Sequence, residues 1–225
     1  MAGRYGGLHH QHQQQQQPSR YDPAGSEGGA GPEATLWTKY HEIRAVFNVR
    51  TCPENRVLPL YDDSGRYVDM NEVWPRVFVG GEGAARNTFY LKKVGVTHVL
   101  NTAEGSRMGT VDTNQNYYKP FGIKYKGLKL LDVAQTNISM YFNEVADFID
   151  DAVRSGGQVL VNCLMGMSRS STCVIAYLML KQNMTAVQAL TEVRRHRDVR
   201  PNDGFLRQLA DLDNKLRRER GQLMG

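Results

Sequence analysis

The sequence is poor in cysteine and has no long apolar run. Its three cysteines, Cys52, Cys163 and Cys173, form no CxxC or CxxH spacing, so neither a redox pair nor a zinc site is indicated. No stretch reaches the roughly 18 apolar residues of a membrane helix, and no signal-peptide pattern opens the chain. We therefore expect reduced thiols, no metal or cofactor, no membrane partner, and a cytoplasmic or nuclear location.

The first 33 residues are poor in aliphatic side chains and rich in Gly, Gln and Pro. Such a composition cannot form a packed core, so we predict a disordered tail over residues 1–33. Three histidines in the tail could hold a metal: His9, His10 and His12. They lie in a Gln-rich low-complexity tract, and random sequence variation in such a tract explains them better than a metal site does.

The charge of the chain is modestly positive, with a formal net charge of +5. Arginine outnumbers lysine and clusters late, in the stretch "RRHRDVR" of residues 194–200. Arginine binds carboxylates and phosphates through a planar fork of donors, so we expect acidic or phosphorylated protein partners. We expect no nucleic-acid partner.

Residues 34–70 form a segment of different character from the tail. The apolar side chains of Leu36, Tyr40, Ile43 and Phe47 recur at three- and four-residue spacings, which predicts an amphipathic helix over 35–49. Two prolines and a glycine turn predict a loop over 52–67. We interpret the segment as a lid over a site, a docking segment or a surface for self-association, and the sequence leaves the oligomeric state open.

Residues 71–220 alternate short apolar runs with helical patterns. The apolar runs predict strands over 76–81, 97–103, 123–132 and 158–162. The helical patterns predict helices over 83–95, 138–157, 169–182, 185–197 and 203–220. Strands that alternate with helices indicate an α/β domain with a largely parallel central sheet, whose working loops lie at the carboxyl ends of the strands.

The stretch "VLVNCLMGMSRSS" places Cys163 at the end of a predicted buried strand, six residues before Arg169. Gly166 permits a tight turn, and an apolar helix begins directly after the arginine. A strand, a tight loop and a helix N-terminus in series direct backbone N–H groups at one point, which makes an anion site. A cysteine at the end of an apolar strand is more often a buried structural thiol, but this setting favours a reactive one.

The chemistry that fits this arrangement is phosphoryl transfer. N–H dipoles favour the thiolate of Cys163, which can then attack phosphorus. The guanidinium of Arg169 can hold two phosphate oxygens at once. Ser170 is placed to hydrogen-bond the sulfur when it leaves. The phosphate would lie against the rest of the loop, residues Leu164, Met165, Gly166, Met167 and Ser168.

The stretch "VLVNCLMGMSRSSTCVIAYLM" resembles the signature of cysteine-dependent protein phosphatases, and most closely the atypical dual-specificity phosphatases of the VHR-like subgroup. The resemblance extends over about 71–216, through "NEVWPRVFVGG", "GVTHVLNTAEG", "YFNEVADFIDDAV" and "RPNDGFLRQL". It implies a three-layer α/β phosphatase fold, hydrolysis of phosphotyrosine and phosphoserine or phosphothreonine, and a general acid. The motif gives Cys173 no role, so we expect it in the core.

A phosphomonoester needs a proton on its leaving oxygen, so a carboxylic acid must reach the site from another loop. Asp132 ends the predicted strand "IKYKGLKLLD" and also matches the aspartate position of the family. The other candidates are Asp112, Asp147 and Asp150, of which the last two fall in a predicted helix and are better explained as solvated charges.

The sequence departs from the family pattern at Asn162, where members have histidine before the cysteine. An asparagine amide can donate a hydrogen bond where an imidazole would, but it carries no positive charge. We expect a thiol pKa lowered by less than in the family, and each unit lost is worth about 1.4 kcal/mol. The expectation is an active but slow enzyme, with a pseudophosphatase that binds phosphoproteins as the alternative.

The loop between Cys163 and Arg169 carries no basic side chain. The resemblance implies Lys or Arg in this stretch for lipid-phosphate and RNA 5′-phosphatases of the superfamily, so we expect a phosphoprotein substrate before a lipid, sugar or RNA phosphate. The resemblance associates Arg197 with a second phosphate near the mouth of the site. With that contact, the doubly phosphorylated Thr-x-Tyr loop of a MAP kinase is the natural substrate. The alternative is that the arginine cluster caps a helix C-terminus. We also expect "AEGSRMG", residues 103–109, to line the pocket with Arg107 near phosphate.

Overall fold

The structure is a computed structural model that describes residues 32–49 and 61–221. The predicted tail lies outside the described residues except for its last two positions, which already belong to a helix. The three tail histidines, Cys52 and the first part of the predicted loop over 52–67 also lie outside them.

A five-stranded sheet with the strand order β1-β2-β5-β3-β4 forms the centre of the domain. Its strands are β1 (Met70–Trp74), β2 (Val77–Gly80), β3 (His98–Asn101), β4 (Lys124–Gly127) and β5 (Val159–Asn162). β1 is antiparallel to β2, and the three other pairings are parallel. The carboxyl ends of β2 to β5 therefore meet at one edge of the sheet, where the loop that carries Cys163 begins.

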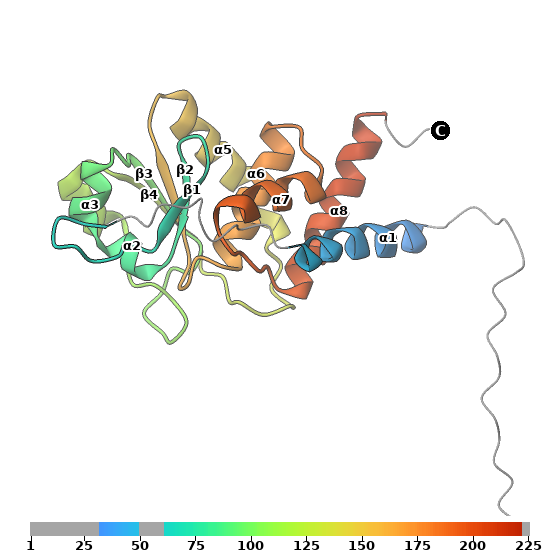
Figure 1. Ribbon diagram of the computed structural model, residues 1–225, viewed down its shortest axis with the longest axis horizontal. Helices are drawn as coiled ribbons and strands as arrows, with labels where there is room; N and C mark the ends of the chain where they lie inside the picture. Colours follow the sequence, from blue (N-terminus) through green and yellow to red (C-terminus); the bar gives the residue numbers. More distant parts are fainter. Residues whose placement is uncertain (1–31, 50–60, 222–225) are drawn as a thin grey trace, which may run out of the picture. The chain divides into compact units, whose positions relative to one another are not determined.

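Helices cover both faces of the sheet, as Figure 1 shows. One layer holds α2 (Glu82–Arg86), α3 (Thr88–Lys93), α4 (Gln115–Tyr118) and the 3₁₀ turn η2 (Lys119–Phe121). The other holds the 3₁₀ turn η3 (Ser139–Tyr141), α5 (Phe142–Arg154), α6 (Arg169–Lys181), α7 (Ala186–His196) and α8 (Asp203–Glu219). This arrangement confirms the predicted mostly parallel α/β fold with helical layers.

The strand residues alternate between two hydrophobic clusters. In the central strand β5, Val159 and Val161 pack with α5 to α8, whereas Leu160 packs with α2 and α3 on the opposite face. All three side chains are completely buried. Because both faces are covered, β5 needs apolar residues at every position, which is why it appears in the sequence as a continuous apolar run.

The structure differs from the predicted elements at three places. The single helix predicted over 83–95 is two helices, because the side chain of Asn87 accepts a hydrogen bond from Tyr90 N and starts α3. The strand predicted over 123–132 ends at Gly127, where its pairing with Asn101 stops. β1 was not predicted; it is a short edge strand that pairs only with β2.

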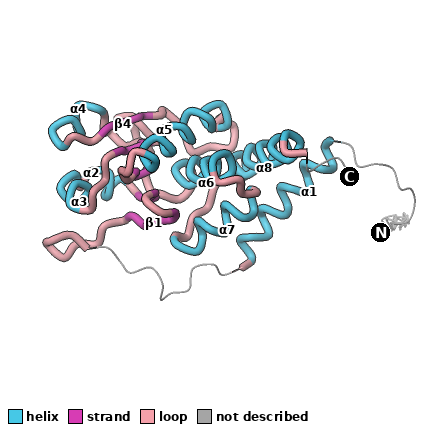
Figure 2. Tube along the Cα trace, turned by 90° about the horizontal axis from the view of Figure 1, so that it is seen from above, coloured by secondary structure: helices cyan, strands magenta, loops and turns pink. Residues whose placement is uncertain are grey.

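The predicted amphipathic helix is present as α1 (Pro32–Ala45), followed by the 3₁₀ turn η1 (Val46–Asn48). It packs against α8, as Figure 2 shows from above. Tyr40, Ile43 and Val46 are buried in the larger hydrophobic cluster. The helix is thus built into the core of the domain, and its use as a lid or docking segment stays a prediction.

No helix in the described residues combines the length and the apolar character that a bilayer span requires.

Candidate active site

The loop of residues 163–168 joins β5 to α6 and turns its carbonyl groups outward. Four consecutive carbonyls accept hydrogen bonds from outside the loop: Leu164 from Glu82 N (2.9 Å), Met165 from Arg197 Nη2 (2.9 Å), Gly166 from Arg197 Nε (2.8 Å) and Met167 from Arg200 N (2.9 Å). In a planar trans peptide the N–H group points opposite to the carbonyl. The N–H groups of the residues that follow these carbonyls therefore face the inside of the loop.

Gly166 is required by the close packing of this loop. Its φ of +65° lies in the left-handed region, which side chains other than glycine rarely adopt. A Cβ atom here would also come within 2.6 Å of the Gly80 backbone and 2.7 Å of Arg197 Nη2. The loop can therefore close tightly only around glycine.

The helix α6 begins at Arg169, immediately after the loop. Its first turn adds unpaired N–H groups and the positive end of the helix dipole to the inward-facing N–H groups of the loop. Together these groups form a preformed anion site at the carboxyl edge of the sheet.

Cys163 lies at the bottom of this site and is 1% exposed. The hydroxyl of Ser170 donates a hydrogen bond to its Sγ at 3.4 Å. Burial is the largest influence and raises the pKa of the Cys163 thiol. The hydrogen bonds from the Ser170 side chain and from the backbone of Ser170 and Met167, with the charge of Arg169, outweigh it, so the pKa is lower than that of an ordinary thiol.

The Arg169 guanidinium is hydrogen-bonded to the protein through its Nη1. Its Nη1 donates to the carbonyls of Gly109 (3.0 Å) and Leu130 (3.1 Å), which come from two other strand-end loops. Its Nε is buried and donates no hydrogen bond within the described part of the chain. The anchored Nη1 therefore leaves Nε as a charged donor for an oxyanion.

Asp132 comes from the loop after β4, and its carboxylate lies beside the Arg169 guanidinium. Its Oδ2 lies 3.6 Å from Arg169 Nε, and its Oδ1 accepts hydrogen bonds from Ser168 Oγ (2.7 Å) and Asn202 Nδ2 (2.9 Å). The side chain is 36% exposed, so water and a substrate can reach it.

The other carboxylates considered as general acids are absent from the lining of the cavity that opens above Cys163. On α5, Asp147 pairs with Lys181 at 2.7 Å and Asp150 with Arg154 at 3.7 Å. Asp112 is exposed on the loop after β3. Among the four candidates, only Asp132 is close to Arg169.

Asn162 is completely buried and hydrogen-bonds Asn101, its neighbour on β3. Its Nδ2 donates to Asn101 Oδ1 at 3.3 Å. This amide orientation is fixed, because Asn101 Nδ2 donates to Val111 O and Thr113 Oγ1 and so leaves Oδ1 facing Asn162. The Oδ1 of Asn162 has no hydrogen-bond partner in the part of the chain that the structure describes. Asn162 thus ties two strand ends together and adds no charge near the thiol.

A cavity of about 530 Å³ opens above Cys163. Its charged lining residues are Asp132, Arg169 and Arg200. The rest of the rim is largely apolar and well exposed, with Met108, Leu131, Val133 and Met165 between 46% and 101% exposed. Leu164, Met167, Ser168, Gly109 and Asn202 complete the lining.

The structure brings Cys163, Arg169, Asp132 and Ser170 together, but it corrects the expectation for Arg197. This side chain lies behind the loop and is 9% exposed. Besides the carbonyls of Met165 and Gly166, it binds Asn71 Oδ1 (2.8 Å) and Asp69 Oδ1 (2.7 Å). The prediction that Arg197 contacts a second phosphate at the mouth is wrong, because all three of its nitrogens are bound internally.

Arg107 is exposed and is absent from the lining of the cavity. Its loop reaches the site through its neighbours instead, because Met108 lines the rim and the carbonyl of Gly109 anchors Arg169. The expectation for the loop thus holds, and the expectation for Arg107 does not.

The sequence analysis missed Arg200 and Asn202, and Leu131 and Val133 of the apolar rim. Arg200 had a signal in the sequence, because it belongs to the same basic cluster as Arg197. Leu131 and Val133 had none, because an isolated apolar side chain at the surface is common in any protein.

Comparison with known proteins agrees with this geometry. The family model "Dual specificity phosphatase, catalytic domain" matches residues 77–215. The chain belongs to the dual specificity phosphatase family. Within the family, the VHR-like subgroup is a finer prediction with which the match is consistent.

Three solved dual specificity phosphatase-like structures are similar to the chain. A mouse putative dual specificity phosphatase, complexed with zinc tungstate, has a TM-score of 0.61 and 25% identity over 72% of this chain and 96% of its own. The Yvh1 phosphatase domain from Chaetomium thermophilum has a TM-score of 0.56 and 30% identity over 65% and 96%. The human tyrosine phosphatase-like serine/threonine/tyrosine-interacting protein has a TM-score of 0.54 and 28% identity over 65% and 97%.

Proposed function

We propose that this dual specificity phosphatase removes phosphate from phosphotyrosine, phosphoserine and phosphothreonine in proteins through a phosphocysteine at Cys163. The observation that carries the proposal is the placement of the Cys163 thiol. The thiol lies inside the loop of residues 163–168, in which the carbonyls of residues 164–167 are held outward. The Nε of Arg169 is available there for an oxyanion.

In the first step the Cys163 thiolate attacks phosphorus, so that a sulfur–phosphorus bond forms as the phosphorus–oxygen bond to the substrate breaks. The inward N–H groups and Arg169 hold the equatorial oxygens in the transition state. Asp132, in its acid form, gives its proton to the leaving oxygen.

In the second step water attacks the phosphocysteine, and the Asp132 carboxylate takes a proton from it. The sulfur–phosphorus bond breaks and inorganic phosphate forms. The Ser170 hydroxyl, 3.4 Å from the sulfur, stabilises the departing thiolate.

The apolar rim supports a protein substrate. Met108, Leu131, Val133 and Met165 surround a site whose lining cations, among the residues that the structure describes, are Arg169 and Arg200. A peptide brings apolar side chains to such a rim, whereas an inositol phosphate or an RNA end brings further anions. The activation loop of a MAP kinase is a candidate substrate, but Arg197 lends it no support, since its side chain is turned inward.

The alternative function is a pseudophosphatase that binds phosphoproteins with little turnover. The observation in its favour is Asn162, whose side chain bonds Asn101 and supplies no charge near the thiol. The human neighbour described as phosphatase-like shares the fold, so the fold alone does not separate the two functions.

A turnover assay with Cys163→Ser separates them. Wild type and variant are compared on an aryl phosphate and on peptides that carry phosphotyrosine or phosphothreonine, with peptide binding measured in parallel. Turnover of all three substrates by wild type, and loss of turnover with retained binding in Cys163→Ser, is the expected result. Equal binding with no turnover above that of Cys163→Ser supports the pseudophosphatase instead.

A further inference from the structure

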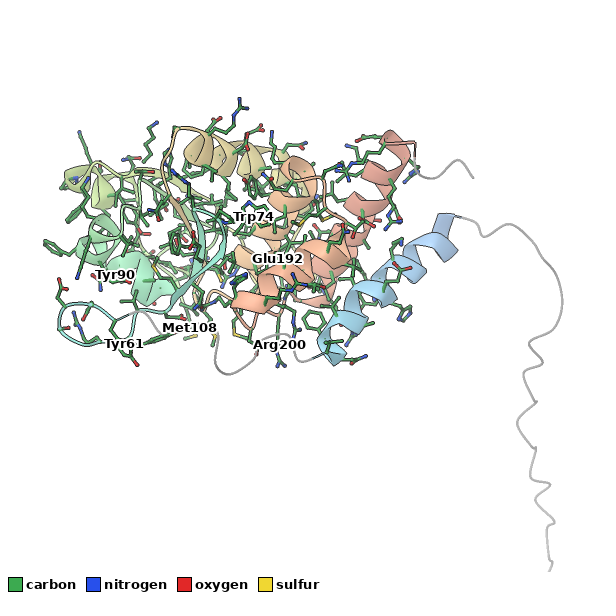
Figure 3. The ribbon with its side chains drawn as sticks, turned by 45° about the horizontal axis from the view of Figure 1, so that its top comes forward. Tyr61, Trp74, Tyr90, Met108, Glu192 and Arg200 are labelled. Carbon is green, nitrogen blue, oxygen red and sulfur yellow. The ribbon has the colours of Figure 1, made fainter. Side chains whose placement is uncertain are left out.

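Four exposed apolar side chains form the apolar rim of the active-site cavity, and they come from three different loops. Met108 lies on the loop after β3 and is 101% exposed. Leu131 and Val133 lie on the loop after β4, and Met165 lies on the loop between β5 and α6; these three are at least 46% exposed. In Figure 3 Met108 and Arg200, which both line this cavity, lie along the lower side of the molecule. Segments that are far apart in the sequence thus bring apolar surface to one opening.

The folding of the domain does not explain the apolar rim. None of its four side chains belongs to the hydrophobic clusters that the described residues form. An apolar side chain stabilises a fold when it is buried, and it adds little while water covers it. A single apolar side chain at the surface is common, but several that share one opening form a patch of the kind that binds a partner.

The charged residues of the cavity lie apart from the rim side chains in their chemistry. Among the lining residues that the structure describes, the charged ones are Asp132, Arg169 and Arg200. Asp132 lies 3.6 Å from Arg169 Nε, where the phosphate would bind. The rim side chains carry no charge and no strong hydrogen-bonding group, so a polar side chain placed on them would lose water without gaining a partner. An apolar side chain would release water from both surfaces and lose no hydrogen bond.

We propose that the apolar rim binds a large apolar side chain next to the phosphorylated residue of the substrate. The inference rests on the proposed function, because it assumes a phosphopeptide at Cys163. The rim borders the cavity that holds the phosphorylated residue, so the side chains nearest to that residue along the substrate meet the rim. Methionine is unbranched and flexible, so Met108 and Met165 can fit apolar side chains of different shapes. The rim therefore selects apolar character, and it accepts leucine, methionine and phenylalanine alike.

The test uses phosphotyrosine peptides in which one neighbouring position at a time carries leucine or asparagine, two side chains of nearly equal size. The ratio of kcat/KM for the leucine peptide to that for the asparagine peptide is measured with the full chain. We expect a ratio of about ten at one or more positions, because a leucine side chain is buried against the rim. A ratio close to one at every position overturns the inference and leaves the proposed function standing.

Substitutions in the rim test whether these side chains cause the preference. Met108→Gln and Leu131→Asn make the rim polar at nearly constant size. The double variant should bring the ratio close to one, and each single variant should lower it in part. A leucine preference that survives unchanged in the double variant overturns the inference.

Met140→Gln is the matched control for these substitutions. Met140 lies on η3, is 67% exposed and is absent from the lining of the cavity. This variant should keep the wild-type ratio. Loss of the preference in Met140→Gln would show that the loss does not depend on the rim, and would overturn the inference.

A second copy of the chain is another occupant that could cover an apolar patch. In that case kcat/KM on an aryl phosphate would fall as the enzyme concentration rises in the wild type, and would not fall in Met108→Gln. Such a result would overturn the inference. We expect a kcat/KM that does not depend on the enzyme concentration.

If no peptide is hydrolysed, the proposed function fails and binding to Cys163→Ser decides the inference. There the leucine peptide should bind about tenfold more tightly than the asparagine peptide. Adding Met108→Gln and Leu131→Asn to Cys163→Ser should remove this difference. Equal affinity for the two peptides in Cys163→Ser overturns the inference.

Discussion

The Nε of Arg197 donates a 2.8 Å hydrogen bond to the carbonyl of Gly166, at the turn of the loop of residues 163–168. The same guanidinium binds Met165 O and, through Asn71 and Asp69, the edge of β1. It therefore holds two loop carbonyls outward, so that the N–H groups after them face the anion site. We therefore expect Arg197 to act on a bound phosphate through the loop and not by contact.

Replacing Arg197 with methionine should loosen this loop. The carbonyls of Met165 and Gly166 would lose their donors, and such a loss costs about 1–3 kcal/mol of unfolding free energy. Affinity for tungstate, a tetrahedral oxyanion like phosphate, should fall as well. Urea denaturation and a tungstate titration measure the two effects. Arg195→Met, on the exposed face of α7, should change neither; unchanged tungstate affinity in Arg197→Met contradicts the bracing role.

Replacing Ser170 with alanine should raise the pKa of Cys163, because the variant loses the side-chain hydrogen bond that lowers it. The wild-type thiol pKa is lowered, so the thiolate persists as the pH falls below the ordinary thiol range. The variant should therefore react more slowly with iodoacetamide near about pH 6.5 and about equally near pH 9.

Peptide mass spectrometry distinguishes the thiols in this experiment. Cys173 is the internal control, because it is completely buried and burial raises its pKa. It should stay unmodified at both pH values. Equal alkylation of Cys163 at low pH in wild type and Ser170→Ala contradicts the assignment of Ser170.

Replacing Asp132 with asparagine should slow the hydrolysis of substrates with poor leaving groups. The amide keeps an oxygen for Ser168 and Asn202 but supplies no proton. We expect kcat to fall about 100-fold or more on phosphothreonine peptides, and by much less on an activated aryl phosphate. The control is Asp147→Asn, which alters a carboxylate on α5 that pairs with Lys181 on α6. This variant should behave as wild type. An equal loss on both substrates would show that Asp132 only maintains the structure.

Replacing Asn162 with histidine should lower the pKa of Cys163 further, because a protonated imidazole adds positive charge beside the strand end. Turnover near about pH 6 should rise, on the order of tenfold for each pKa unit. Asn162→Asp changes the charge in the opposite sense at nearly constant volume, and should raise the thiol pKa and slow turnover. The pH profiles of kcat/KM for the three proteins provide the comparison. Identical profiles would mean that Asn162 does not limit the chemistry.

The elements that bury a continuous apolar run were predictable from the sequence. β5 and the helix after Arg169 appear as such runs, and the strand, loop and helix around Cys163 follow from them. Edge elements were harder to predict. β1 and β4 are the edge strands of the sheet, and each pairs with a single neighbouring strand. The length of an edge strand depends on that one pairing, and β4 ends at Gly127 because its pairing with β3 ends there.

The orientation of the arginines could not be read from the sequence. Arg197 turns inward because Asp69 and Asn71 accept its hydrogen bonds, and these residues lie more than 120 positions earlier in the chain. Arg200, three residues later, pairs with the exposed Asp198 at 3.4 Å and stays exposed at the mouth. Local pattern shows that a basic cluster is present, and only the tertiary contacts decide which member faces the substrate.

The most direct test of a nucleophilic Cys163 is to detect the phosphocysteine. Ser170→Ala should accumulate it, because the departing thiolate loses the hydroxyl that stabilises it. After a rapid acid quench during turnover of an aryl phosphate, mass spectrometry should find one phosphate on the peptide that contains Cys163 and none on the peptide that contains Cys173. Continued turnover with no phosphate on the Cys163 peptide would contradict the account.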